Sequence, residues 1–131
     1  MVIARSTREN IPFILERERE LPPEQQTTFL LATLAHHVML QLLQLSQQGR
    51  SRDYVELALR AGLRGWKQFP DEKGNETPFR REEGKTVTVH GAEVKGPVTP
   101  ATLAVIPIDI VLELVNAIVG ENRVTDDDAK N

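Results

Sequence analysis

Three histidines are the residues of this chain most able to bind a metal ion or carry a proton. His36 and His37 are neighbours in a stretch of helical periodicity. Neighbouring side chains on a helix point about 100° apart, so the pair cannot chelate one ion. No His-Glu-x-x-His pattern supplies another ligand one turn away, and His90 has no evident catalytic partner. We therefore expect His36 and His37 at surface positions of a helix and no metal site.

Two groups of carboxylates invite a calcium-binding interpretation. One is the run of aspartates at 126–128, and the other surrounds Gly74. Neither has the ligand spacing of an EF-hand loop. We therefore predict no metal binding by Asp71, Glu72, Glu76, Asp126, Asp127 and Asp128.

Other catalytic arrangements are also missing from the sequence. The chain contains no cysteine, which excludes a thiolate nucleophile, a disulfide and a cysteine-ligated metal. No glycine-rich phosphate loop, nucleophile elbow or serine-histidine-acid set can be assembled. We predict a protein that is not an enzyme and that binds no cofactor.

A basic and aromatic segment is the best candidate for binding another molecule. Arginines and a lysine surround the only tryptophan, Trp66. With a net charge of −3 and an isoelectric point near 5.6 the chain lacks the basic excess typical of nucleic-acid binding, whereas Trp and Arg are favoured anchors of protein interfaces. The alternative is that Trp66 simply fills the core. The predicted protein-interaction residues are Arg60, Arg64, Trp66, Phe69 and Phe79.

The chain has the length of one domain, because 131 residues are enough for a single hydrophobic core. No apolar stretch approaches the length of a transmembrane helix, and the first residues lack the apolar run of a secretory signal. We predict an intracellular protein with an α+β fold that is mainly helical: a helical hairpin and a C-terminal helix with a small antiparallel β element. The predicted segments are an extended N-terminal segment (1–32), a helical hairpin (33–65), a turn and β-hairpin region (66–98), C-terminal helices (99–120) and a flexible tail (121–131).

Hydrophobic spacing supports the helical segments. Apolar residues recur at helical spacing from about 34 to 48, with Met39, Leu40 and Leu43 widening the apolar face, and Gly49 suits a helix end. A second helix begins near Ser51 and runs to about 63. The short connection at 48–50 makes the two helices antiparallel neighbours.

β-forming residues mark the remaining elements. Residues 11–15 and 27–31 are rich in β-formers and predict two short strands, separated by a segment that contains two prolines. Alternation at 86–90 predicts a hairpin that pairs this segment with 78–81. Short helices are expected from Thr99 to about 105 and from 108 to 120, with Pro107 between them.

The order of short phrases in the second half resembles a known protein family. The phrases are ALRAGLRGWKQF at 58–69, DEKGN at 71–75, PF at 78–79, IPIDIVLELVNAI at 106–118 and the ending NRVTDDDAKN at 122–131. Together they resemble small morphogenesis proteins of tailed bacteriophages, in particular the tail assembly chaperones encoded between the tail tube and tape measure genes. The resemblance covers about residues 50–131, with a weaker echo at 18–29.

The resemblance implies a non-enzymatic protein of the bacterial host cytoplasm. Such a chaperone binds the tape measure protein, recruits tail tube subunits and does not stay in the finished virion. Residues 80–97 form a longer insert than the compact helical versions of the family, which leaves open a permanent virion component at the capsid or head-tail junction. A weaker alternative, suggested by the acidic net charge, is an inhibitor of a host protein. Self-association is also open, and neither nucleic acid nor a membrane is an expected partner.

Overall fold

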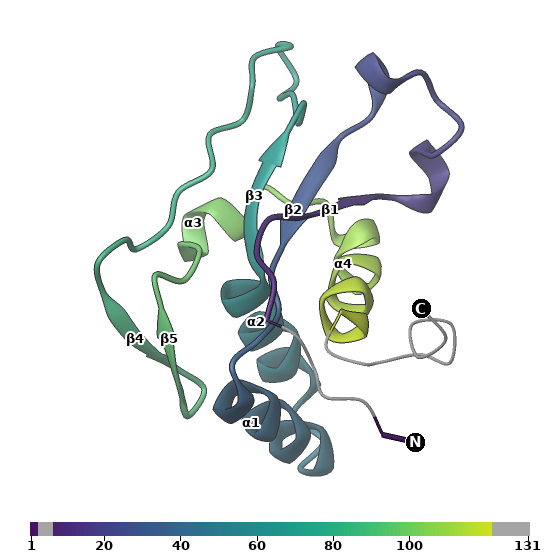
Figure 1. Cartoon of the computed structure of the whole chain (residues 1–131). Helices are drawn as coiled ribbons and strands as arrows, with labels where there is room; N and C mark the ends of the chain where they lie inside the picture. Colours follow the sequence, from purple (N-terminus) through teal and green to yellow (C-terminus); the bar gives the residue numbers. More distant parts are fainter. Residues whose placement is uncertain (3–6, 122–131) are drawn as a thin grey trace.

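The computed structural model describes residues 1–2 and 7–121, which form two small antiparallel sheets and a set of helices (Figure 1). Helix accounts for 40% and strand for 21% of this structure. The expectation of a mainly helical protein with one small β element is therefore wrong, because the extended segments build two separate sheets within an α+β fold. The predicted flexible tail lies outside the described residues apart from Glu121, and the aspartates at 126–128 lie outside them too.

The larger sheet joins the N-terminal segment to the chain that leaves the helical hairpin. Its strands β1 (Ile11–Ile14), β2 (Thr28–Leu31) and β3 (Leu63–Lys67) are antiparallel in the order β1-β2-β3. Phe29 in the middle strand lies opposite Trp66. The sequence predicts a helix end and a turn for residues 63–67, but their backbone groups pair with β2, a long-range partner that local patterns do not reveal. Two short 3-10 helices, η1 (Glu16–Glu18) and η2 (Pro23–Gln25), connect β1 to β2.

Three helices supply much of the rest of the core. Helices α1 (His36–Gln47) and α2 (Ser51–Gly62) are joined by a tight turn in which Gly49 has a φ of 70°. Helix α4 (Ile108–Gly120) packs against α2, which therefore lies between α1 and α4 and is buried over its last six residues (Figure 1). None of the helices in the described part of the chain has the length and apolar character needed to cross a lipid bilayer.

The smaller sheet is a hairpin of β4 (Thr86–Val89) and β5 (Ala92–Lys95) that packs against α1 and α2. The predicted pairing of 86–90 with 78–81 is wrong, because the strand turns back immediately at His90 and Gly91. Their φ values of 44° and 89° give both turn residues the left-handed conformation of a tight two-residue hairpin loop. Arg81 instead forms an isolated bridge with Val98. Helix α3 (Pro100–Leu103) follows, and the side chain of Thr99 accepts a hydrogen bond from the Thr102 amide at 3.2 Å.

The contact between α2 and α4 gives a first testable prediction. A Cβ added at Gly62 would lie 2.3 Å from Cγ2 of Ile118, a side chain that is fully buried. Gly62→Ala should therefore push the two helices apart and lower the free energy of unfolding by about 1–3 kcal/mol. Urea denaturation monitored by circular dichroism measures the change.

Gly120→Ala is the matched control, because Gly120 also ends a helix and a Cβ there would meet no atom within 4 Å. It should leave stability unchanged or raise it by up to about 1 kcal/mol. Equal effects of the two substitutions would contradict the close packing of α2 on α4.

Candidate functional site

Trp66 belongs to the core. Its side chain on β3 is only 8% exposed and contacts Phe69 and Phe79 edge to face, each at a centroid distance of 4.8 Å. Phe29 extends the cluster at 6.4 Å, and the indole Nε1 donates a hydrogen bond to the Thr77 carbonyl at 2.8 Å. The three predicted aromatic residues are therefore brought together, but as a packed cluster that leaves little of Trp66 for a partner.

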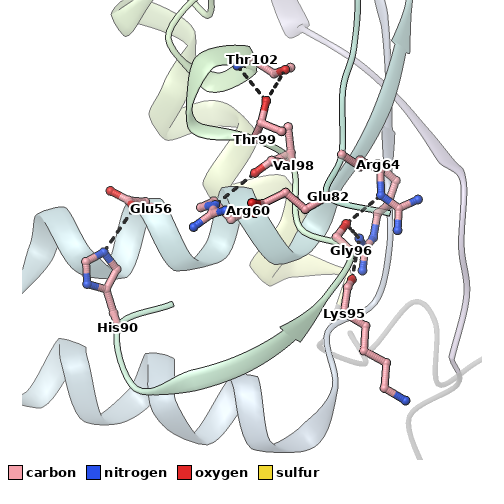
Figure 2. A network of polar contacts seen from close by, with 11 residues as sticks. Glu56, Arg60, Arg64, Glu82, His90, Lys95, Gly96, Val98, Thr99 and Thr102 are labelled. Atoms are coloured by element: carbon pink, nitrogen blue, oxygen red, sulfur yellow. Dashed lines mark hydrogen bonds and ion pairs between the residues drawn. The ribbon is translucent and has the colours of Figure 1, made fainter. Parts of the chain in front are cut away.

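Arg60 is also a structural residue. It is 7% exposed, and its Nε donates to the carbonyl of Val98 at 3.0 Å. One terminal nitrogen pairs with Oε2 of Glu82 at 2.5 Å, so Arg60 ties α2 to the segments on either side of the smaller sheet (Figure 2). The sequence offered no signal for this pair, because its members are 22 residues apart.

Arg64 binds the backbone at the end of the smaller sheet. Its Nη1 donates to the carbonyl of Gly96 at 3.0 Å and, more weakly, to that of Lys95 at 3.4 Å (Figure 2). Burial lowers the pKa of Arg64, and the nearby Arg81 lowers it further, whereas Glu9 raises it. The predicted basic and aromatic residues thus divide into two separate structural groups and form no shared binding surface.

The histidines lie on the surface of the helical hairpin and at the adjacent strand turn. His36 and His37 are exposed, as expected, and His37 Nε2 lies 2.6 Å from the carbonyl of Glu93. His90 contacts two carboxylates of α2, Asp53 at 3.6 Å and Glu56 at 3.4 Å (Figure 2 shows the second). No group of three or more metal-ligating side chains occurs among residues 1–2 and 7–121.

The most distinctive surface is an apolar groove on α1. Leu40 and Leu43 are 53% and 56% exposed, and their spacing of three residues places them side by side on a helix that also contributes to the core. Beside them lies a hollow of about 370 Å³ between α1, Tyr54 of α2 and Val119 of α4. We call this surface the α1 groove; its lining residues are Leu34, His36, Met39, Leu40, Leu42, Leu43, Ser46, Tyr54 and Val119.

The groove was not predicted from the sequence, although its apolar residues on α1 were noted there. The sequence places Leu40 and Leu43 on a widened apolar face of this helix, and apolar residues cover more of the helix than one core-facing stripe requires. That excess was the available signal. A second pair of exposed apolar residues, Ile108 and Leu112, lies one turn apart on α4, with exposed fractions of 86% and 65%.

The chain matches no protein-family model, no curated protein and no solved structure. The α1 groove is therefore identified from its own shape, exposure and composition. A concave apolar surface of this kind can bury the apolar side chains of a partner.

Proposed function

We propose that this protein is a non-enzymatic tail assembly chaperone of a tailed bacteriophage, which holds an apolar helical segment of the tape measure protein in the α1 groove. The observation that carries the proposal is the pair of half-exposed leucines, Leu40 and Leu43, beside an apolar hollow. Burial of these leucines against a partner would favour binding, because in the free protein their apolar surface stays exposed to water.

The chemistry of α1 argues for an apolar partner. None of the twelve residues of α1 is Asp, Glu, Lys or Arg. A charged side chain of a partner would lose its hydration against this helix and find no opposite charge. The occupant that fits is therefore a face of apolar side chains flanked by neutral polar groups.

The dimensions of α1 argue for a helical partner. A twelve-residue helix is about 18 Å long, which matches about three turns of another helix. An amphipathic helix in a groove places anchors at positions i, i+3 or i+4 and i+7. The resemblance of residues 50–131 to tail assembly chaperones supplies the identity of that helix, because the long tape measure protein is the partner that those chaperones hold. Recruitment of tail tube subunits and a place in the host cytoplasm belong to the same proposal.

The groove gives a second testable prediction. Leu40→Gln combined with Leu43→Gln should weaken binding of the tape measure protein by about 2 kcal/mol, or roughly 30-fold, because both side chains lose their apolar contacts. Isothermal titration calorimetry of each variant with separately purified tape measure protein measures the change in affinity. Stability should hardly fall, since both leucines are already half exposed.

Ile108→Gln combined with Leu112→Gln is the matched control. It replaces two exposed apolar residues on another helix and should leave the affinity for the tape measure protein unchanged. Loss of binding in this variant together with normal binding by the Leu40/Leu43 variant would contradict the α1 groove as the binding surface.

Mass spectrometry of purified phage particles beside the infected-cell lysate tests the chaperone role itself. Peptides of this chain should be present in the lysate and missing from the virions. Stoichiometric presence in virions would contradict the chaperone and favour a permanent component at the capsid or head-tail junction. Capture of a host protein without any binding of tape measure protein would favour an inhibitor instead.

A further inference from the structure

Arg64 and Arg81 stand apart from the other arginines of the protein. Both are half-buried, and neither has a carboxylate within ion-pair distance in the part of the chain that the structure describes. A half-buried cation without a partner loses hydration and gains no compensating attraction. The other described arginines are either paired with a carboxylate (Arg8, Arg17, Arg50 and Arg60) or exposed (Arg19, Arg52 and Arg80).

The two guanidinium groups converge on one acceptor. Arg81 donates through Nε to the carbonyl of Gly96 at 2.8 Å, and Arg64 donates to the same oxygen through Nη1 at 3.0 Å. Two positive charges that share one neutral carbonyl repel each other. Glu9 is close enough to act on Arg64 electrostatically but is exposed and makes no ion pair with it within 4.0 Å.

Donors of this pair are left without acceptors. A guanidinium group carries five N–H donors and accepts no hydrogen bonds. The Nε of Arg64 is buried and has no hydrogen-bond partner, the only buried side-chain nitrogen or oxygen in that condition among the described residues. The missing hydrogen bond adds to the cost of burying the charge of Arg64, and an anion held by the other guanidinium nitrogens would offset that cost.

Space for a ligand lies beside both arginines. Arg64 lines a hollow of about 510 Å³ and Arg81 lines an adjoining one of about 490 Å³. Thr86 and Lys95, a cross-strand pair at the end of the smaller sheet, line both hollows. The side chain of Lys95 extends away from Arg64 in Figure 2, so the two arginines are the cations at this point.

We propose that Arg64 and Arg81 form a binding site for an oxyanion, a carboxylate or phosphate group that bridges the two guanidinium groups. The fork of a guanidinium group matches the paired oxygens of either anion. The bound anion would accept hydrogen bonds from the unused donors and cancel the repulsion between the two arginines. The acidic residues that line the hollows, Glu9, Glu83 and Glu93, are all exposed, so their charges are screened by water and do not close the site.

Nuclear magnetic resonance of the arginine Nε–Hε groups tests the site in the intact protein. Inorganic phosphate and succinate are titrated separately at constant ionic strength, with chloride as the replaced anion. We expect a saturable shift of the Arg64 and Arg81 signals while the signal of exposed Arg52 stays unchanged. Saturation by phosphate alone assigns the site to phosphate groups, and saturation by succinate alone assigns it to carboxylates. If neither anion produced a saturable shift at Arg64 or Arg81, the proposal would be wrong.

Variants separate specific binding from general charge effects. Arg81→Gln should lower the affinity of the protein for the anion at least about tenfold, because a charge-assisted hydrogen bond is lost. Arg52→Gln should leave that affinity unchanged. Arg81→Lys keeps the positive charge but loses the forked guanidinium group, so this variant should also bind the anion more weakly. If circular dichroism shows that Arg81→Gln does not fold, Arg81→Lys takes its place in the experiment. Affinity equal to that of the unmodified protein in the folded Arg81 variant would overturn the proposal.

Discussion

Replacing Trp66 with alanine should lower the free energy of unfolding by about 3–5 kcal/mol, because a large buried ring is removed from the centre of an aromatic cluster. Phe69 and Phe79 would each lose an edge-to-face contact, and the Thr77 carbonyl would lose its hydrogen-bond donor. Small single domains are stable by only about 5–15 kcal/mol. The substitution should therefore bring the protein close to unfolding at room temperature.

Urea denaturation of the purified variant measures this change, with circular dichroism as the signal because the tryptophan fluorescence is lost. Trp66→Phe is the matched control: it keeps an aromatic ring in the cluster and should be less destabilising than alanine. Unfolding of Trp66→Ala at the same urea concentration as the unmodified protein would show that the ring is not part of the core.

Replacing Arg60 with methionine should have the second-largest effect, a loss of about 3 kcal/mol in the free energy of unfolding. Methionine retains the apolar stem but leaves the carboxylate of Glu82 and the buried carbonyl of Val98 without their donor. Removing one partner of a buried ion pair is strongly destabilising, since the other charge stays uncompensated. The side chain of Glu82 is 29% exposed, which places the expected loss at the low end of the usual range.

Glu82→Gln is the control for the Arg60 prediction. It removes the charge and keeps a hydrogen-bond acceptor beside Arg60, so it should cost less than Arg60→Met. The double variant measures the coupling between the two residues. Additive effects of the two single substitutions would contradict a direct stabilising interaction between Arg60 and Glu82.

The helices could be predicted from the sequence because their signals are local. Apolar residues at helical spacing and the glycine at 49 placed the first helix at about 34–48, close to the observed His36–Gln47. The end of the first helix at Gly49 and the start of the second helix at Ser51 could also be predicted from the sequence. Proline at position 107 likewise marked the boundary before α4, which begins at Ile108.

The sheets were harder to predict because their partners are distant or their turns are unusual. The local sequence of β3 is typical of a glycine-rich turn. It forms a strand because the fold places it next to Thr28–Leu31, with which it pairs. β5 is only four residues long, and its turn places His90 at a positive φ that non-glycine residues rarely adopt. The inward alternation of Ala92 and Val94 was the one local signal of that strand.

The candidate site was the least predictable part. Residue types favoured Trp66 and its arginines as interface anchors, but type alone does not separate a buried anchor from a surface one. The excess of apolar residues on α1 is visible in the sequence, but which of them stay exposed depends on how α1, α2 and α4 meet. The unsatisfied Nε of Arg64 is likewise a property of the fold.

Leucine methyl spectra of the protein with and without the tape measure protein report on Leu40 and Leu43 themselves and so test the α1 groove as the binding surface. We predict that the methyl signals of these two residues shift or broaden on binding. The signals of Leu21 and Leu112, which are exposed outside the groove, should stay unchanged. A complex that leaves Leu40 and Leu43 unperturbed, or no complex at all, would contradict the assignment of the α1 groove as the surface that holds the tape measure protein.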